Sequence, residues 1–284
     1  MVFKVLGIDE VVDRRVVEWL LRQVLVDPAT HSYALYDLIY QPKNTRFNVV
    51  VRGEDIIGYV LEWSGQGSYA IHFWGTNIPV ELIYDALKHG LGSRSVYIHI
   101  HSSILEPIIT EIAGRIYEGF DREVFIDMVV DRKSFKPYNV TGNNVVKTLD
   151  PEKDALEFME IKERQSRRVS YDEAKSILEE NVYVGVFREN KLVSMAGAIV
   201  RLHDAWIVAD VFTLPEHRGR GYAKLATSKI TSSGLDAGVK KITLHVNSEN
   251  TIAIRVYKRL GYYETSRKTR LIVIKQISLK ASHN

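Results

Sequence analysis

The chain begins with apolar residues at helical spacing and continues with short runs typical of β-strands. Apolar positions between residues 12 and 26 recur about every four residues behind Asp9, a possible cap, and predict a core-facing helix. The runs at residues 47–52 and 56–63 flank a three-residue turn and predict a β-hairpin. Further β-type runs lie at residues 69–74, 95–101 and 123–130, and helical stretches at 80–91 and 105–117. Strands alternating with helices predict an α/β layer structure.

A polar stretch at residues 131–144 predicts a linker, so we expect two domains, residues 1–135 and 145–284. The second half opens with a strand-like segment, residues 145–149, and carries a capping box from Ser170 to Glu173. Three β-type runs follow at residues 182–188, 192–201 and 205–213, and Pro215 ends the last of them.

The two halves resemble each other in sequence. Residues 52–57 match residues 188–193 at an offset of 136 (188 − 52), and residues 98–102 match 244–248 at an offset of 146 (244 − 98). The second copy is longer where residues 216–222 stand. These matches predict a tandem of two related folds, of which the first lacks the chemistry.

Composition narrows the class of protein. With 284 residues, 45% hydrophobic and 26% charged, the chain is typical of a soluble protein of two ordinary domains. Its longest apolar runs contain charges and its start has no signal-peptide pattern, so we expect a cytoplasmic protein that does not cross a membrane. A net charge of +3 is too small to predict binding to nucleic acid or an anionic membrane.

The chain contains no cysteine, which excludes disulfides, thiolate metal sites and a cysteine nucleophile. Covalent catalysis would need another side chain, so direct transfer is the simpler mechanism. His99 and His101 share one face of a strand, but no third ligand stands close in sequence. We therefore expect a solvated or covered strand face there, and no metal site.

The loop at residues 214–223 joins a β-type run to a helix. A helix begins with N–H groups that lack intrahelical partners, and it carries the positive end of the helix dipole there. Gly219 and Gly221 let the backbone approach a ligand, and the charges of Arg218, Arg220 and Lys224 favour a diphosphate. Neither a Walker motif nor a dinucleotide fingerprint is present here, so ATP and NAD are poor candidates. An ordinary glycine turn with solvated arginines is the alternative.

Two further motifs follow the loop in order. Arg218-x-x-Gly221-x-Ala223, then Asn250-x-x-Ala253-x-x-x-Tyr257 and Leu260-Gly261-Tyr262, resemble the GNAT superfamily of acetyl-CoA-dependent N-acyltransferases over about residues 145–279. The two-domain layout resembles its glycine N-acyltransferase-like branch. The resemblance implies an α/β fold with a mixed sheet, in tandem GNAT-like domains. The C-terminal one would carry the acetyl-CoA site, and the N-terminal one would be degenerate.

The resemblance also implies the cofactor contacts. The strand through Val211 would splay from its parallel neighbour, residues 241–246, so that pantetheine inserts between them and the Val211 N–H binds the acetyl oxygen. Asn250 would bind pantetheine or position its helix. The residues expected to bind coenzyme A are Val211, Phe212, Thr213, Arg218, Gly219, Arg220, Gly221, Tyr222, Ala223, Lys224 and Asn250.

Catalytic roles follow from the same resemblance. Tyr257 matches the general acid that re-protonates the leaving thiolate, although a core tyrosine fits the helix stripe as well. Ile207 stands where many relatives have a glutamate base. His245, twelve residues before Tyr257, is the substitute, with a structural histidine as the equal alternative. Asp210 is a second candidate, although strand alternation points it to the other face of the sheet.

The sequence thus predicts an N-acetyltransferase that moves an acetyl group from acetyl-CoA to a primary amine by direct transfer, without a metal. The acceptor is a small molecule or a peptide. A non-catalytic acyl-CoA sensor or interaction module is the alternative, favoured by Ile207 and by the degenerate first copy. The sequence specifies no oligomeric state.

Overall fold

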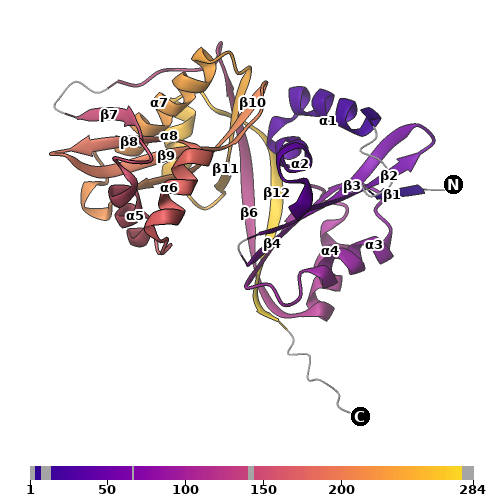
Figure 1. Ribbon diagram of the computed structural model, residues 1–284. Helices are drawn as coiled ribbons and strands as arrows, with labels where there is room; N and C mark the ends of the chain where they lie inside the picture. Colours follow the sequence, from indigo (N-terminus) through magenta and orange to yellow (C-terminus); the bar gives the residue numbers. More distant parts are fainter. Residues whose placement is uncertain (1–3, 8–13, 66, 140–143, 277–284) are drawn as a thin grey trace. The chain divides into compact units, whose positions relative to one another are not determined.

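One order of helices and strands occurs twice in succession in the computed structural model, which describes residues 4–7, 14–65, 67–139 and 144–276 (Figure 1). The first copy contains β1 (Lys4–Gly7), α1 (Arg14–Val26), α2 (Pro28–Tyr40), β2 (Thr45–Arg52), β3 (Asp55–Gly65), β4 (Ser68–Gly75), α3 (Val80–His89), β5 (Ser95–Ile100), α4 (Glu106–Ile116) and β6 (Tyr117–Asp131). The second contains β7 (Val145–Thr148), α5 (Ala155–Arg164), α6 (Tyr171–Glu180), β8 (Val182–Arg188), β9 (Lys191–Arg201), β10 (Ala205–Thr213), α7 (Tyr222–Asp236), β11 (Lys241–Asn247), α8 (Thr251–Arg259) and β12 (Tyr263–Gln276). The predicted tandem is present.

The two copies exchange their last strands. Contacts divide the chain into a first compact unit within Met1–Arg22, Tyr33–Ile126 and Ser266–Asn284, and a second within Gln23–Ser32 and Asp127–Thr265. In the first unit β12 pairs with β5, and in the second the end of β6 lies beside β11. The expected contiguous ranges, 1–135 and 145–284, therefore do not coincide with the compact units. Residues 140–143 of the expected linker and the possible cap Asp9 lie outside the described residues.

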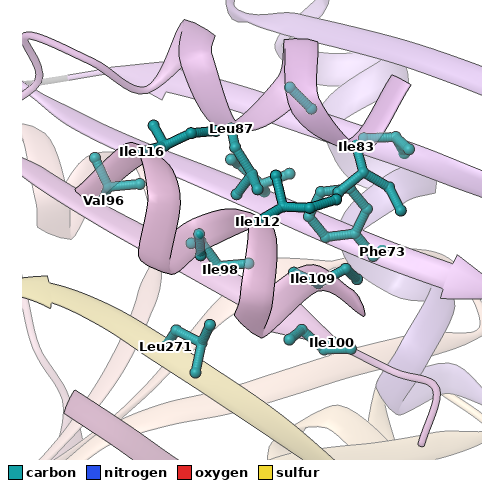
Figure 2. Packing of buried hydrophobic residues seen from close by; sticks show 14 of the residues in the cluster. Phe73, Ile83, Leu87, Val96, Ile98, Ile100, Ile109, Ile112, Ile116 and Leu271 are labelled. Carbon is teal, nitrogen blue, oxygen red and sulfur yellow. The ribbon is translucent and has the colours of Figure 1, made fainter. Parts of the chain in front are cut away.

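The first unit is a sheet in the order β1-β2-β3-β4-β5-β12, antiparallel in its described ladders except for the parallel pair β4–β5. α3 and α4 pack on this sheet, because their apolar stripes and the strand residues beneath them form one buried cluster (Figure 2). Its members include Phe73, Ile83, Leu87, Ile98, Ile109, Ile112 and Leu271. Leu271 comes from β12, so the exchanged strand completes this core.

We expect Ile98→Ala to lower the free energy of unfolding by about 2–5 kcal/mol, because the truncation leaves a cavity in a close-packed core. Ile98 is 0% exposed within the cluster. Ile104→Ala is the matched control: that side chain is 61% exposed, so its loss should change stability by less than about 0.5 kcal/mol. Urea denaturation measures both. Equal losses would contradict this assignment of the core.

The second unit has the order β6-β11-β10-β9-β8-β7, with a parallel pair β10–β11. α7 packs on β8, β9 and β10, and α5 packs on α6 and β9. The predicted capping box is present, since the Ser170 side chain accepts from the Glu173 N–H and the Glu173 carboxylate accepts from the Ser170 N–H. In the described part of the chain, no helix combines the length and apolar character that crossing a membrane requires.

Candidate functional site

The loop between β10 and α7 presents a helix N-terminus that no side chain caps among the residues the structure describes. Gly219 and Gly221 have φ angles of 77° and 82°, in the left-handed region that favours glycine. Gly221 is the N-cap of α7, so the N–H groups of the next three residues lack helical partners. The first turn of α7 contains no acidic residue. These groups can therefore bind an external anion.

Cationic side chains surround this helix end. Arg218 and Arg220 are exposed, and Arg218 Nε donates to the Thr213 carbonyl oxygen at 3.2 Å. Tyr222 is buried and its hydroxyl accepts from Arg188 Nη1 at 3.2 Å, so Tyr222 offers an anion only its backbone N–H. The charge of the loop thus comes from the arginines and from Lys224.

Tyr138 contacts the same helix end and was not expected from the sequence. Its N–H donates to Ser228 Oγ at 2.7 Å, and Lys224 Nζ lies 3.8 Å from the centre of its ring. A Cβ at position 221 would come within 2.9 Å of the Tyr138 hydroxyl oxygen. Glycine is therefore required at position 221 by the backbone conformation and by this neighbour.

The parallel strands β10 and β11 separate toward the loop, as the resemblance implied. Their pairing runs from Ala205↔Lys241 to Val208↔Leu244, and no later pair forms between these two fully described strands. Residues 209–212 are half-buried. Backbone groups that face the opening are thus available to an inserted chain.

A β-bulge shapes β10 where the strands separate. Ala209 faces Gly197 and Phe212 faces Met195 on β9, so Asp210 and Val211 together oppose one residue. Asp210 has a φ of 57°, which costs an L-residue about 1–2 kcal/mol. The bulge leaves one extra residue outside the β9–β10 ladder beside the opening.

Asp210 does not fit the role of second candidate base. Its carboxylate is buried and accepts hydrogen bonds from Lys162, Gln165 and Tyr183. Burial by itself raises the pKa of Asp210, but the charge of Lys162 and these hydrogen bonds outweigh it and lower the pKa. An ionised carboxylate held by three donors is a poor proton acceptor.

His245 lies on β11 directly after the last residue paired with β10, and it contacts a buried aspartate. Its Nδ1 is 2.6 Å from Asp127 Oδ1, and the two side chains are 13% and 1% exposed. An ionised Asp127 accepts from Nδ1–H, which leaves the lone pair on Nε2. This tautomer suits a general base, and the same hydrogen bond also satisfies a structural histidine.

Tyr257 is the buried residue of α8, with its ring centre 6.0 Å from that of Tyr262. Burial raises the pKa of Tyr257 to about 12. The hydroxyl therefore stays protonated throughout the neutral range and can act as an acid. Among the described residues it has no hydrogen-bond partner, whereas the Tyr262 hydroxyl lies 2.7 Å from Thr231 Oγ1.

Asn250 is the N-cap of α8, and its Oδ1 accepts from the Ala253 N–H at 3.1 Å. It thus positions the helix that carries Tyr257, the second of the two roles expected for it. Gly261 has a φ of 91°, and a Cβ there would lie 1.9 Å from the Ser134 carbonyl oxygen. The glycine after α8 therefore permits close packing of the segment that precedes Tyr138.

The first copy has no equivalent opening between its parallel strands. β4 and β5, both fully described, stay paired from Ser68↔Ser95 to Phe73↔Ile100, and the His101 N–H donates to the Phe73 carbonyl oxygen at 2.9 Å. Tyr33 of α2 packs on His72 with ring centres 5.3 Å apart, and His72 is buried, so this strand face is covered. No cluster typical of a metal site occurs among the residues that the structure describes.

Sequence reasoning missed Asp127, Lys162 and Tyr138. Asp127 is a single acidic residue inside the apolar run 124–130, and an isolated buried charge requires a partner. This isolated charge could therefore have been recognised from the sequence as a residue with a buried partner. Lys162 and Tyr138 stand in an amphipathic helix and in a polar stretch, where a lysine and a tyrosine are ordinary residues.

Comparisons with known proteins agree with this geometry. Residues 151–262 match the family model described as Acetyltransferase (GNAT) family. An uncharacterised N-acetyltransferase of Bacillus subtilis is 37% identical over 49 residues, covering 17% of this chain and 31% of that protein. An aminoglycoside N(6')-acetyltransferase type 1 of Salmonella typhimurium is 35% identical over 57 residues, covering 20% and 39%. The match thus spans about a third of each relative.

Solved structures share the whole fold. A Drosophila protein has a TM-score of 0.71 at 13% identity, with 96% of this chain and 98% of that chain covered. A tandem GNAT protein from the clavulanic acid biosynthesis pathway has a TM-score of 0.61 at 13% identity, covering 95% and 98%. The whole chain therefore has the fold of a tandem GNAT protein, and residues 151–262 match the acetyltransferase (GNAT) family model. The superfamily resemblance is confirmed; the narrower branch stays a prediction.

Proposed function

We propose that the second unit transfers an acetyl group from acetyl-CoA directly to a primary amine. One observation carries this proposal: the uncapped N-terminus of α7 follows the strand pair that opens after Val208 and Leu244, with His245 beside the opening. An anion site followed by a slot with available backbone groups suits a nucleotide that carries an extended thioester arm.

The described residues fit coenzyme A. The left-handed glycines make a cradle that side chains would fill, and the N–H groups of Tyr222, Ala223 and Lys224 point out of the first turn of α7. Arg218 and Arg220 add charge suited to the pyrophosphate. Phe212 and Thr213 line the slot for pantetheine. Acetyl-CoA, when bound, supplies the activated acetyl group as a thioester.

Three further residues would transfer protons or stabilise the charge that develops during acetyl transfer. The Val211 N–H donates to the acetyl oxygen and stabilises the charge that develops there. His245 Nε2 removes a proton from the acceptor amine, with Asp127 holding the imidazole in the required tautomer. Tyr257 donates its phenol proton to the leaving sulfur. Because the chain has no cysteine, no cysteine acyl-enzyme is involved.

We expect Tyr257→Phe to lower turnover by roughly 10²-fold or more, because only the proton donor is removed, while acetyl-CoA affinity stays close to wild type. Tyr262→Phe is the matched control. It deletes the contact with Thr231 and should cost about 1 kcal/mol of stability with little change in turnover. Steady-state kinetics and calorimetric titration separate the two. A parallel loss of affinity and turnover in Tyr257→Phe would indicate a structural tyrosine.

Thiol release from acetyl-CoA, measured with a panel of amines, tests the proposed function. The panel includes an amino acid, a polyamine, a peptide with a free N-terminus, and an aminoglycoside, because one relative is named for that substrate. Release that depends on one amine supports the proposal. Tight binding of acetyl-CoA without release for any amine would instead support a sensor, an alternative favoured by the fully buried Ile207 in place of a carboxylate.

A further inference from the structure

Three donors from two separate elements hold the carboxylate of Asp210. Lys162 Nζ donates to Oδ2 at 2.6 Å, Gln165 Nε2 donates to Oδ1 at 2.8 Å, and the Tyr183 hydroxyl donates to Oδ2 at 2.9 Å. Lys162 and Gln165 belong to the C-terminal end of α5, and Tyr183 to β8. We call these three donors the Asp210 clamp. It fixes both carboxylate oxygens.

Stability alone does not account for the clamp. The side chains of Lys162 and Asp210 are only 4% and 6% exposed, and moving two charges out of water costs about as much as their attraction returns. Replacing a buried ion pair by apolar residues of similar size is often neutral or stabilising. Asp210 also occupies the left-handed region, which glycine would adopt without strain. A buried ion pair at a strained residue therefore requires a conformational reason.

The conformation of Asp210 determines the orientation of the next residue of the strand, Val211. Asp210 and Val211 are the two bulged residues of β10, and the bulge stands just past the last β10–β11 pair. The orientation of the Val211 N–H follows from the backbone angles of Asp210. An L-residue favours the extended region, so the left-handed backbone of Asp210 needs support to keep that N–H in its orientation.

We propose that Lys162, Gln165 and Tyr183 are positioning residues that hold Asp210 in its left-handed conformation and thereby aim the Val211 N–H at the thioester carbonyl. This inference rests on the proposed function, in which Val211 is the donor. The clamp donors bind the carboxylate of Asp210. The clamp acts through the backbone, and a displacement of about 1 Å in such a donor is enough to slow a reaction by roughly 10²-fold.

The carbonyl stretch of acetyl-CoA labelled with ¹³C at the carbonyl carbon, recorded on the complete protein, measures the contact directly. Bound to wild type, the carbonyl should shift to lower frequency because the Val211 N–H polarises it. In Lys162→Met the shift should largely vanish while coenzyme A binds as before. Lys147→Met is the matched control, since Lys147 pairs at 2.7 Å with the buried carboxylate of Asp154, away from the bulge. It should keep the full shift.

If Lys162→Met does not fold, Tyr183→Phe tests the clamp instead. This variant removes one hydrogen bond to Asp210 and keeps the ring packed on Phe158. A partial loss of the shift supports the clamp. A wild-type shift in every folded clamp variant overturns the clamp and leaves the proposed function intact. A wild type that binds acetyl-CoA without any shift overturns Val211 as the donor, and the clamp with it.

Discussion

Replacing His245 by alanine is expected to lower turnover by roughly 10²-fold to 10⁴-fold, the usual contribution of a positioned general base. Coenzyme A affinity should stay close to wild type, because the proposed anion site belongs to α7 and not to β11. The acidic limb of the pH–rate profile, which arises because a protonated imidazole cannot accept the amine proton, should disappear. Steady-state kinetics across pH measures both effects.

His203→Ala is the control for this prediction. His203 belongs to the same unit, pairs with Asp204 at 3.1 Å and is 92% exposed, so its removal should change neither turnover nor the acidic limb. Asp127→Asn tests the partner, since asparagine keeps a hydrogen-bonding oxygen but loses the charge that favours the Nδ1–H tautomer. We expect it to lower turnover by roughly 10²-fold. Unchanged kinetics in His245→Ala would make His245 structural and leave the acceptor amine as the titrating group.

The parts of the fold that depend on local signals were predictable from sequence. The turn after Arg52, the capping box at Ser170 and the loop at Gly221 all have short-range chemistry and lie where they were expected. The turn is one residue shorter than predicted, because Asp55 already pairs with Arg52 in the hairpin. The separation of β10 from β11 followed from a family resemblance, not from residue patterns. Periodicity does not contain that information, because both strands read as ordinary buried strands.

The exchange of β6 and β12 between the two copies could not be predicted from local sequence signals. Each strand contains an apolar run, residues 124–126 in β6 and 271–274 in β12, that would fit beside the central strands of either copy, and the choice depends on long-range packing. Leu271 of β12 joins the core of the first unit, while Asp127 of β6 reaches His245 in the second. In the proposed mechanism, the carboxylate that is absent at Ile207 therefore has a counterpart in the first copy. A search confined to residues 145–284 could not find it.

The first copy shows why repetition of a fold does not repeat its site. Its β4–β5 ladder remains closed, and α3 begins after Pro79 without a glycine loop. No bulge interrupts the pairing of β3 with β4 in its described residues, in contrast to β9 with β10. A backbone closed at these points offers neither an anion cradle nor a slot. This copy contributes a strand and its aspartate to the second unit.

Gly221→Asp should raise the dissociation constant of coenzyme A by at least roughly 10²-fold. The substitution places a negative charge at the positive end of α7, where the pyrophosphate would accept hydrogen bonds, and loss of one charge-assisted contact alone costs about 1.5–3 kcal/mol. It also forces an L-residue to a φ of 82° and brings a side chain against the Tyr138 hydroxyl. Titration calorimetry with coenzyme A measures the change, and circular dichroism verifies the fold.

Two further variants separate the effect of the negative charge in Gly221→Asp from the effects of backbone strain and of crowding against Tyr138. Gly238 has a φ of 93° just beyond the other end of α7, and nothing lies within 4 Å of the position that a Cβ would take there. Gly238→Asp therefore carries comparable backbone strain without reaching the anion site, and it should bind coenzyme A normally. Combining Tyr138→Ala with Gly221→Asp removes the crowding, and affinity should stay low. Recovered affinity in the double variant would mean that Gly221→Asp lowers coenzyme A affinity by displacing Tyr138. Normal coenzyme A binding by folded Gly221→Asp would exclude this loop as the pyrophosphate site.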